Sequence, residues 1–404
     1  MATQHNARHN RRAGLTVAIV FTAYMAVVFG LGLYLFSLLA SEMRQTLGFG
    51  TQAIGMITAA AQVSYLIAAG LCPMLTKRFG EMTVIVAAVI VAGVILTLVS
   101  TAGTTASMGA LVGSLGACAA FMVIPTVGVI SRTVAFEYRS QVNGLVSSGT
   151  AYGQFASGSL APWLVLENGW RSAWLVFGAG SIAIALVGLL ALRIFAPAAF
   201  GRTPEATAIK SQHTPLLNPT NLSVWTLLAA SGMACGPWQN YLSTFLSVEN
   251  GHSISVVGQL WSMIGFLGLF SGFAMGLLAD KIGIKRTLSI SYGLIALAAV
   301  LIALHSDTTL LYAAAICFGL SFFAVYGLIP AYITKTMDAS ETTAVFAGAN
   351  ICLGLGTAFG NLTSGYIPNL TGSLQHAYFG IAIIACAAAA FVGTLPKEPR
   401  RTDP

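Results

Sequence analysis

Residues 276–286 read Gly-Leu-Leu-Ala-Asp-Lys-Ile-Gly-Ile-Lys-Arg, a short charged turn that separates two long apolar runs. The runs at 255–279 and 285–304 are each as long as a membrane-crossing helix, which takes about 20 residues. A turn of this length between two such runs predicts neighbouring helices that cross a bilayer in opposite directions and meet at the same membrane surface.

The same alternation of apolar runs and short polar turns extends over the whole chain. The twelve predicted spans are 14–39, 52–76, 82–101, 105–131, 140–166, 171–193, 221–247, 255–279, 285–304, 309–334, 341–367 and 375–395. Only one connection is long, and it carries four prolines. We therefore expect an all-α membrane protein with a six-helix bundle at 1–193, a linker at 194–220 and a second six-helix bundle at 221–404.

The composition excludes most soluble classes of protein. Hydrophobic residues make up 56% of the 404 residues and charged residues only 8%, against about 25% charged residues in a soluble domain. Neither a soluble globule nor a disordered chain fits these values, and binding to nucleic acid is not expected despite the net charge of +7. The 43 glycines suit membrane helices, which pack through small residues.

Lysine and arginine indicate the orientation of the chain. Of the 19 basic residues, only Arg44 and Arg171 fall in turns that the twelve-span arrangement places outside. This asymmetry follows the positive-inside rule and predicts that both termini are cytoplasmic. An arrangement with ten or eleven spans would mix the two sets of turns.

The two halves of the chain repeat one another. Residues 149–158 read Gly-Thr-Ala-Tyr-Gly-Gln-Phe-Ala-Ser-Gly, and residues 356–365 read Gly-Thr-Ala-Phe-Gly-Asn-Leu-Thr-Ser-Gly, at an offset of 207. Glycines spaced in this way let a second helix approach closely, so we interpret them as packing positions. Two six-helix halves in parallel repeat are typical of transporters that hold their substrate near the middle of the membrane.

The turn at 276–286 resembles the signature of the major facilitator superfamily, G-x-L-x-D-R/K-x-G-R/K-R/K. It also lies between the second and third predicted helices of its half, where that family has it. The resemblance implies alternating access and a latch in which Asp280 meets the start of the eleventh helix while Lys281 and Arg286 brace it. Gly276 and Gly283 complete the turn.

The matching turn of the first half, residues 73–80, departs from the signature. It keeps the basic Arg78 and the last glycine, Gly80, but Lys77 stands where the signature has an acid. The segments at 138–144 and 169–178 resemble the monocarboxylate and oxalate–formate branch of the superfamily. That branch implies transport of small organic acids, often with a proton.

Charged residues are missing from the predicted membrane interior. All 12 acids and all six histidines fall at span ends, in turns or in tails, so a carboxylate substrate would have to be recognised by neutral groups. The candidate substrate-binding residues are Tyr24, Gln62, Tyr65, Gln154, Trp238, Gln239, Tyr241, Trp261, Tyr326 and Asn350. For the amides, hydrogen bonding between helices is the alternative, and for Trp238 to Tyr241 an aromatic belt at the interface.

Other functional classes leave no trace in the sequence. There is no GxxxxGK[ST] loop for nucleotide, no repeated filter sequence, and no catalytic or metal-binding constellation, so we expect a transporter rather than an enzyme, with no cofactor or metal. We expect a monomer in a plasma membrane, most plausibly a bacterial inner membrane, that moves a monocarboxylate or aromatic acid, alone or with a proton. An exporter of lipophilic compounds and a membrane scaffold or receptor are the alternatives.

Overall fold

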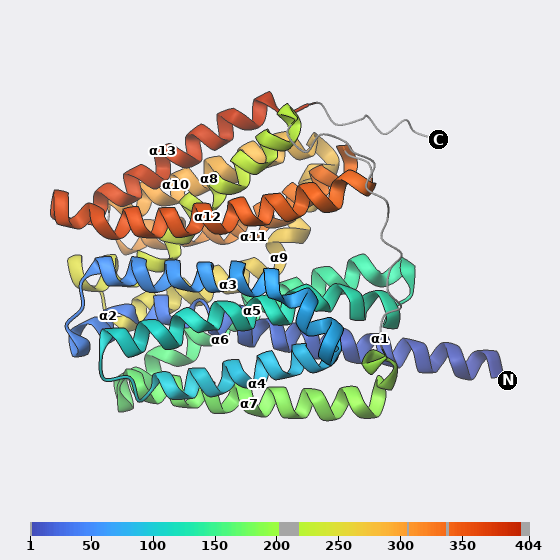
Figure 1. The fold of residues 1–404 in the computed structure, drawn as a ribbon. Helices are drawn as coiled ribbons and strands as arrows, with labels where there is room; N and C mark the ends of the chain where they lie inside the picture. Colours follow the sequence, from blue (N-terminus) through green and yellow to red (C-terminus); the bar gives the residue numbers. More distant parts are fainter. Residues whose placement is uncertain (1, 202–217, 305–306, 337–338, 397–404) are drawn as a thin grey trace. The chain divides into compact units, whose positions relative to one another are not determined.

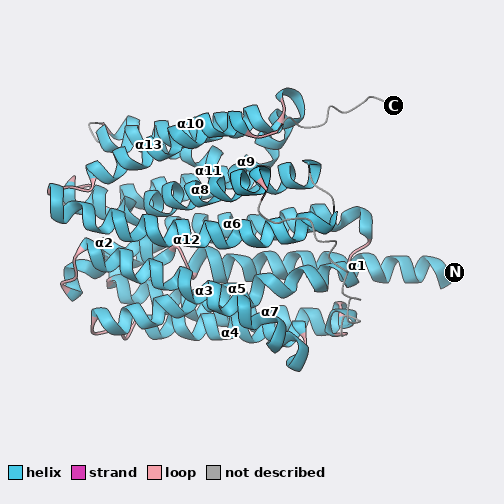
Figure 2. Ribbon diagram, turned by 45° about the horizontal axis from the view of Figure 1, so that its top comes forward, coloured by secondary structure: helices cyan, strands magenta, loops and turns pink. Residues whose placement is uncertain are grey.

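A computed structural model describes residues 2–201, 218–304, 307–336 and 339–396. Within these ranges the chain is helical almost throughout and contains no strand (Figure 2). The helices group into two compact units (Figure 1). Unit 1 comprises Met1–Phe49 and Ala60–Ala206, and unit 2 comprises Gly50–Ala59 and Thr207–Pro404.

Unit 1 contains the elements that precede the linker. They are α1 (Ala2–Met25), the π-helical segment η1 (Ala26–Leu31), α2 (Leu35–Leu47), most of α3 (Thr51–Phe79), α4 (Glu81–Val99), α5 (Thr105–Thr133), η2 (Phe136–Tyr138), α6 (Arg139–Asn168), α7 (Trp170–Phe195) and η3 (Pro197–Phe200). Within this unit α4 packs along α5 and α7, and α6 packs along α1.

Unit 2 contains the elements after the linker together with the beginning of α3. They are α8 (Pro219–Thr244), the π-helical segment η4 (Phe245–Glu249), α9 (Ile254–Ile282), α10 (Ile284–Leu304), α11 (Thr308–Thr336), α12 (Ala339–Thr371), α13 (Gln375–Phe391) and η5 (Val392–Thr394). Here α8 packs along α12, and α11 packs along α9 and α10.

Eleven of the twelve predicted spans coincide with helices whose ends lie within four residues of the predicted ones. The first prediction, 14–39, was too short, because one long helical segment extends over Arg12–Leu47. The polar letters around Glu42 suggested an end to the span. However, α2 is amphipathic and buries Leu38, Leu39 and Met43, so the helix continues past them.

Ten helices among the described residues are long and apolar enough to cross a membrane. The two long helices outside this group are α6 and α8, of 30 and 26 residues. Both carry buried polar side chains, such as Gln154 on α6 and Asn240 on α8, and these lower their hydropathy.

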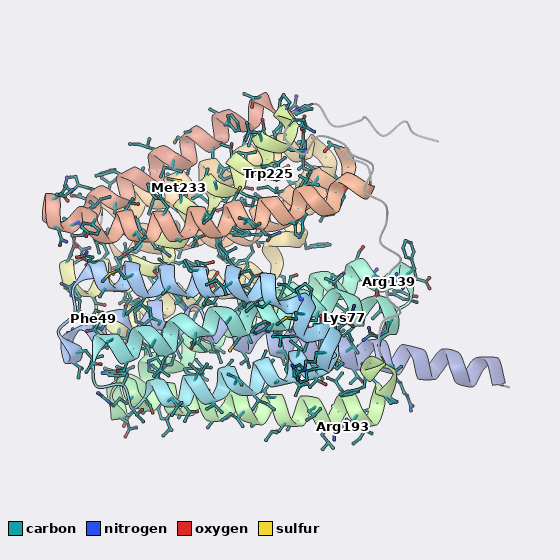
Figure 3. All side chains as sticks on the ribbon, in the orientation of Figure 1. Phe49, Lys77, Arg139, Arg193, Trp225 and Met233 are labelled. Atoms are coloured by element: carbon teal, nitrogen blue, oxygen red, sulfur yellow. The ribbon has the colours of Figure 1, made fainter. Side chains whose placement is uncertain are left out.

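Basic residues gather at one end of each unit. In unit 1, Lys77, Arg139 and Arg193 lie at the end where α7 leads into the linker, and Phe49 lies at the opposite end (Figure 3). We call these the linker end and the far end. Of the basic residues that the structure describes, Arg44 and Arg171 alone stand at a far end, in the last turn of α2 and the first turn of α7.

The internal repeat is visible in the helix bounds. Both α3 and α9 have 29 residues, as do α5 and α11, and the members of each pair begin 203 positions apart. The turns after α3 and α9 each contain a glycine of positive φ, Gly80 at 85° and Gly283 at 92°. The glycine segments of α6 and α12 repeat at 207 instead, so about one helical turn separates the two offsets.

Glycines in the repeated segments set the distance between helices. In unit 1, a methyl group at Gly149 would lie 2.3 Å from the Thr22 carbonyl oxygen, and one at Gly153 would lie 2.4 Å from that of Ala26. In unit 2, a methyl group at Gly356 would lie 2.2 Å from the Ala229 carbonyl oxygen. These positions therefore work as packing positions, in agreement with the interpretation from the sequence.

We predict that Gly153→Ala destabilises the protein by about 1–3 kcal/mol, because the atoms that the new methyl meets belong to the backbone of η1 and cannot rotate away. The matched control is Gly144→Ala on the same helix, where nothing lies within 4 Å of the new methyl. Thermal unfolding of the purified protein in detergent compares the two. Equal midpoints for both variants would contradict the prediction.

Candidate functional site

The candidate residues of unit 1 do not form one cluster. Tyr24 on α1 is fully buried, and its hydroxyl donates a hydrogen bond to the Ala185 carbonyl of α7 at 2.9 Å. Tyr65 on α3 lies edge-on to Phe29 at 6.2 Å between ring centroids. Gln154 is fully buried and Gln62 half-buried. The Tyr24 hydroxyl thus joins two helices of its own bundle.

In unit 2 four aromatic side chains form a continuous row. Trp238 on α8 stacks on Phe318 of α11, with centroids 3.8 Å apart and planes at 6°. Phe318 stacks on Phe322 at 5.1 Å, and Phe322 meets Tyr326 edge-on at 5.1 Å. The spacing of four residues along α11 places the last three rings on one face of the helix. We call Trp238, Phe318, Phe322 and Tyr326 the aromatic row.

A polar cluster joins α8 to α12. The Asn240 side-chain amide donates to Oδ1 of Asn361 at 3.0 Å, and the Tyr241 hydroxyl donates to the Asn361 backbone carbonyl at 2.7 Å. All three side chains are buried. The structure therefore connects Tyr241, which the sequence indicated, to Asn240 and Asn361, which were not among the candidate residues. We call these three residues the amide cluster.

The beginning of α3 packs against this cluster. The Thr51 hydroxyl donates to the Gly365 carbonyl at 3.3 Å. A methyl group at Gly55 would lie 2.5 Å from the Asn361 carbonyl oxygen and 2.6 Å from the Tyr241 hydroxyl. Backbone thus lies on backbone along this seam, and the absence of side chains at Gly55 and Gly365 makes the close approach possible.

The remaining candidates of unit 2 lie apart from the amide cluster in their recorded contacts. Gln239 on α8 and Trp261 on α9 are buried. Asn350 on α12 donates its side-chain amide to the Phe346 carbonyl of its own helix at 2.8 Å. Tyr326 is a side-chain hydrogen-bond partner of Cys235 on α8, so the aromatic row is also tied to α8 at its second end.

No Asp, Glu, His, Lys or Arg is buried among the described residues. The buried polar groups are serine, threonine, asparagine and glutamine side chains, together with tyrosine and tryptophan. Glu249, which follows α8 at the far end, accepts hydrogen bonds from Ser373 at 2.6 Å and from the Leu374 amide at 2.9 Å. It therefore caps the entry to α13.

The turn at 276–286 has the form expected of a sharp helix-to-helix connection. Gly283 ends α9 with a positive φ, Gly276 has open space around it, and Lys281 and Arg286 are exposed. Asp280 pairs with Lys335 in the last turn of α11 at 4.0 Å, with both side chains more than half exposed. Residues 337–338, before α12, and the side chains of its first turn lie outside the described residues, so the contact of Asp280 with that helix start remains a prediction.

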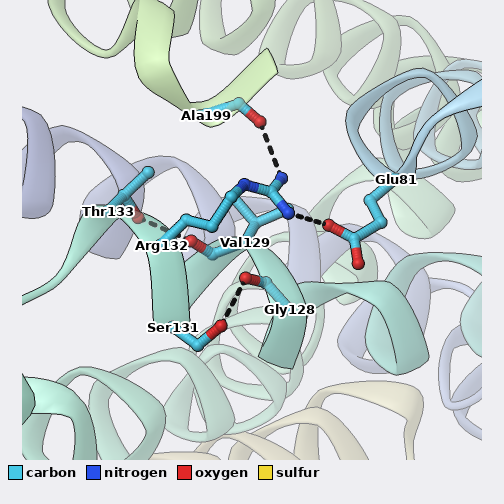
Figure 4. A network of polar contacts seen from close by, with 7 residues as sticks. All are labelled: Glu81, Gly128, Val129, Ser131, Arg132, Thr133 and Ala199. Carbon is cyan, nitrogen blue, oxygen red and sulfur yellow. Dashed lines mark hydrogen bonds and ion pairs between the residues drawn. The ribbon is translucent and has the colours of Figure 1, made fainter. Parts of the chain in front are cut away.

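The equivalent turn of unit 1 holds an ion pair that the sequence signature did not indicate (Figure 4). Arg132, in the last turn of α5, pairs with Glu81, the first residue of α4, and also donates to the Ala199 carbonyl of η3 at 3.1 Å. Lys77 and Arg78 are exposed, with Arg78 over the Phe79 ring. Arg132 rather than Lys77 therefore links the turn to the rest of unit 1.

Unit 2 holds the segment after its last helix in a similar way. Lys285, at the start of α10, donates to the carbonyls of Gly393 and Leu395. The Tyr332 hydroxyl of α11 donates to the Pro396 carbonyl at 3.0 Å. In each unit, basic or phenolic side chains at the linker end thus hold the chain where it leaves the last helix.

Comparison with known proteins agrees with this architecture. The family model described as Major Facilitator Superfamily matches residues 20–361. The chain belongs to the major facilitator superfamily. It is a multi-pass membrane transporter of small solutes and not an enzyme, as the sequence predicted.

Individual relatives within the superfamily are distant in sequence. The cis,cis-muconate transport protein of Acinetobacter baylyi is 23% identical, over 96% of this chain and 95% of that protein. A bacterial homologue of the human lysosomal transporter Spinster, in its inward-facing and occupied structure, gives a TM-score of 0.73 at 16% identity, over 94% of this chain and 95% of that one. The nucleoside transporter NupG gives 0.69 at 16%, over 93% and 99%. These two structures show the fold.

We predict that Arg132→Ala destabilises the protein by about 1–3 kcal/mol, since it leaves the partly buried Glu81 carboxylate without its cation and frees the Ala199 carbonyl. Glu81→Gln should cost less, because the bond to Ala199 survives. Arg193→Ala, an exposed position at the same end, is the control. Chemical unfolding in detergent measures all three, and a loss at Arg193 equal to that at Arg132 would contradict the prediction.

We predict that Gly55→Ala also costs about 1–3 kcal/mol, because its methyl meets the Asn361 carbonyl and the Tyr241 hydroxyl. Tyr241→Phe removes one of these two atoms. The double variant should therefore lose less stability than the sum of the single losses. Gly70→Ala on the same helix, with nothing within 4 Å, is the control. Strict additivity of the two changes would show that the seam is not as close as described.

Proposed function

We propose that this transporter carries a planar conjugated or aromatic carboxylic acid across the cytoplasmic membrane of a bacterium, by exposing its binding site alternately to the two sides. The observation that carries the proposal is the relationship over nearly the whole length to a protein named for the transport of cis,cis-muconate. Muconate is a conjugated dicarboxylic acid. At 23% identity the relationship supports the class of substrate rather than a single compound.

The chemistry of the candidate residues supports the same class. Flat π-systems stack on aromatic side chains, and the aromatic row offers four such rings on α8 and α11. We propose that Trp238, Tyr326 and their neighbours contact the apolar body of the substrate. Neutral amides and hydroxyls such as those of Gln62, Tyr65 and Gln239 are proposed to contact its polar groups.

We further propose that all twelve long helical segments cross the membrane, including α6 and α8. A span needs its backbone hydrogen bonds satisfied within the helix, and it tolerates polar side chains that face other helices. The gathering of basic residues at the linker ends supports cytoplasmic termini. On this orientation Asp280 and Lys335 form part of a cytoplasmic latch. We propose that a single chain is the working unit.

The absence of buried titratable groups among the described residues bears on the energy source. Coupling to protons through the protein needs a group that titrates inside the membrane. We propose instead that the substrate moves down its own gradient, or that a proton travels on the substrate carboxyl group itself.

The test is uptake of labelled cis,cis-muconate, benzoate and 4-hydroxybenzoate by proteoliposomes, with and without an imposed pH gradient. We expect uptake of at least one acid well above that of empty liposomes. A pH gradient without substrate should drive no proton flux, and acid-driven flux should survive Glu42→Gln. Transport of a lipophilic cation such as ethidium, with no uptake of any acid, would overturn the proposal in favour of an exporter.

A further inference from the structure

Asn361 is fully buried on α12, and two of its three polar groups are engaged. Its Oδ1 accepts a hydrogen bond from Asn240 and its backbone carbonyl accepts one from Tyr241. The remaining group, the side-chain Nδ2, is buried and has no hydrogen-bond acceptor among the described residues. Nδ2 carries two N–H donors, so an amide held firmly by its neighbours keeps its donors unused.

An unused buried donor is unfavourable for folding alone. Burying an amide N–H without an acceptor costs about 1–3 kcal/mol by mutational estimates. The same helix shows how a packing asparagine avoids this cost, since Asn350 donates its Nδ2 to the Phe346 carbonyl. Asn240 and Tyr241 fix the position of Asn361 without satisfying Nδ2. This arrangement fits a donor kept for a group that is not part of the chain.

The chemical class of that group follows from the surroundings. Carboxylates are acceptors only, and hydrogen bonds from neutral donors to an ionised oxygen are stronger than those between neutral groups. The described residues bury no cation that would take over this role. Glu249, an acid on the same segment as Tyr241, already accepts bonds from Ser373 and Leu374. No carboxylate of the chain is recorded against Nδ2.

We propose that Asn361 Nδ2 donates a hydrogen bond to a carboxylate oxygen of the transported acid, with Asn240 and Tyr241 as positioning residues. The inference rests on the proposed transport of an organic acid. Asn361 lies ten residues before the end of α12 at Thr371, roughly 15 Å along the helix. The donor therefore lies well inside the length of the helix rather than at its end.

The experiment measures binding of cis,cis-muconate and of its neutral diamide to the purified protein by calorimetry. Asn361→Ala should weaken binding of the acid roughly tenfold or more, the effect of losing a hydrogen bond to a charged group, and should change binding of the diamide much less. Asn361→Asp places a carboxylate there and should reverse the preference in favour of the diamide. Asn369→Asp, an exposed position on the same helix, should bind both as the wild type does.

The outcomes separate the two proposals. If the wild type binds and transports none of the acids tested, the proposed function falls and this inference falls with it. If the wild type binds the acid, and Asn361→Ala and Asn361→Asp keep its preference for acid over diamide, Asn361 is a packing residue and only the inference is overturned. Because the readout is a ratio of two affinities for each variant, a uniform loss of active protein does not change it.

Discussion

The bundles depend on close contact between helix backbones. Inside a bilayer each backbone N–H and C=O must be satisfied within its own helix, so apolar helices gain little from burying more apolar surface and associate through packing. Gly149 and Gly153 in unit 1, and Gly356 in unit 2, bring backbones so near that a single methyl group would overlap a carbonyl oxygen. The polar contacts described above all presuppose helices held at these short distances.

Charge is confined to the ends of the bundles, and there the two units reach one result by different residues. Arg132 and Lys335 each stand one position before the end of helices of 29 residues, and each pairs with an acid beside a glycine of positive φ. In unit 2 the acid, Asp280, precedes the glycine. In unit 1 Lys77 has replaced it, and Glu81 follows the glycine instead. The first residue of a helix is a favourable place for a carboxylate.

Helix positions were predictable because each apolar run has the length of a span and ends at charge, glycine or proline. The first helix was misjudged at Glu42, since polar letters do not reveal that α2 buries its other face. Partners across helices were beyond the sequence. The letters of Asn350 and Asn361 are alike, and only the fold shows that one donates to its own helix while the other leaves Nδ2 unused. Glu81 and Arg132 lie 51 positions apart, and no local pattern joins them.

Tyr241 connects the amide cluster to the helix that the two units share. Its hydroxyl donates to the carbonyl of Asn361, and that same hydroxyl is what a side chain at Gly55 or Gly365 would strike. Gly55 belongs to the first ten residues of α3, which pack with unit 2, whereas the rest of α3 packs with unit 1. A displacement of this short segment therefore changes the surroundings of Asn361 directly. Since packed groups in contact respond together, the position of α3 and the environment of the Nδ2 donor are physically coupled through one phenol.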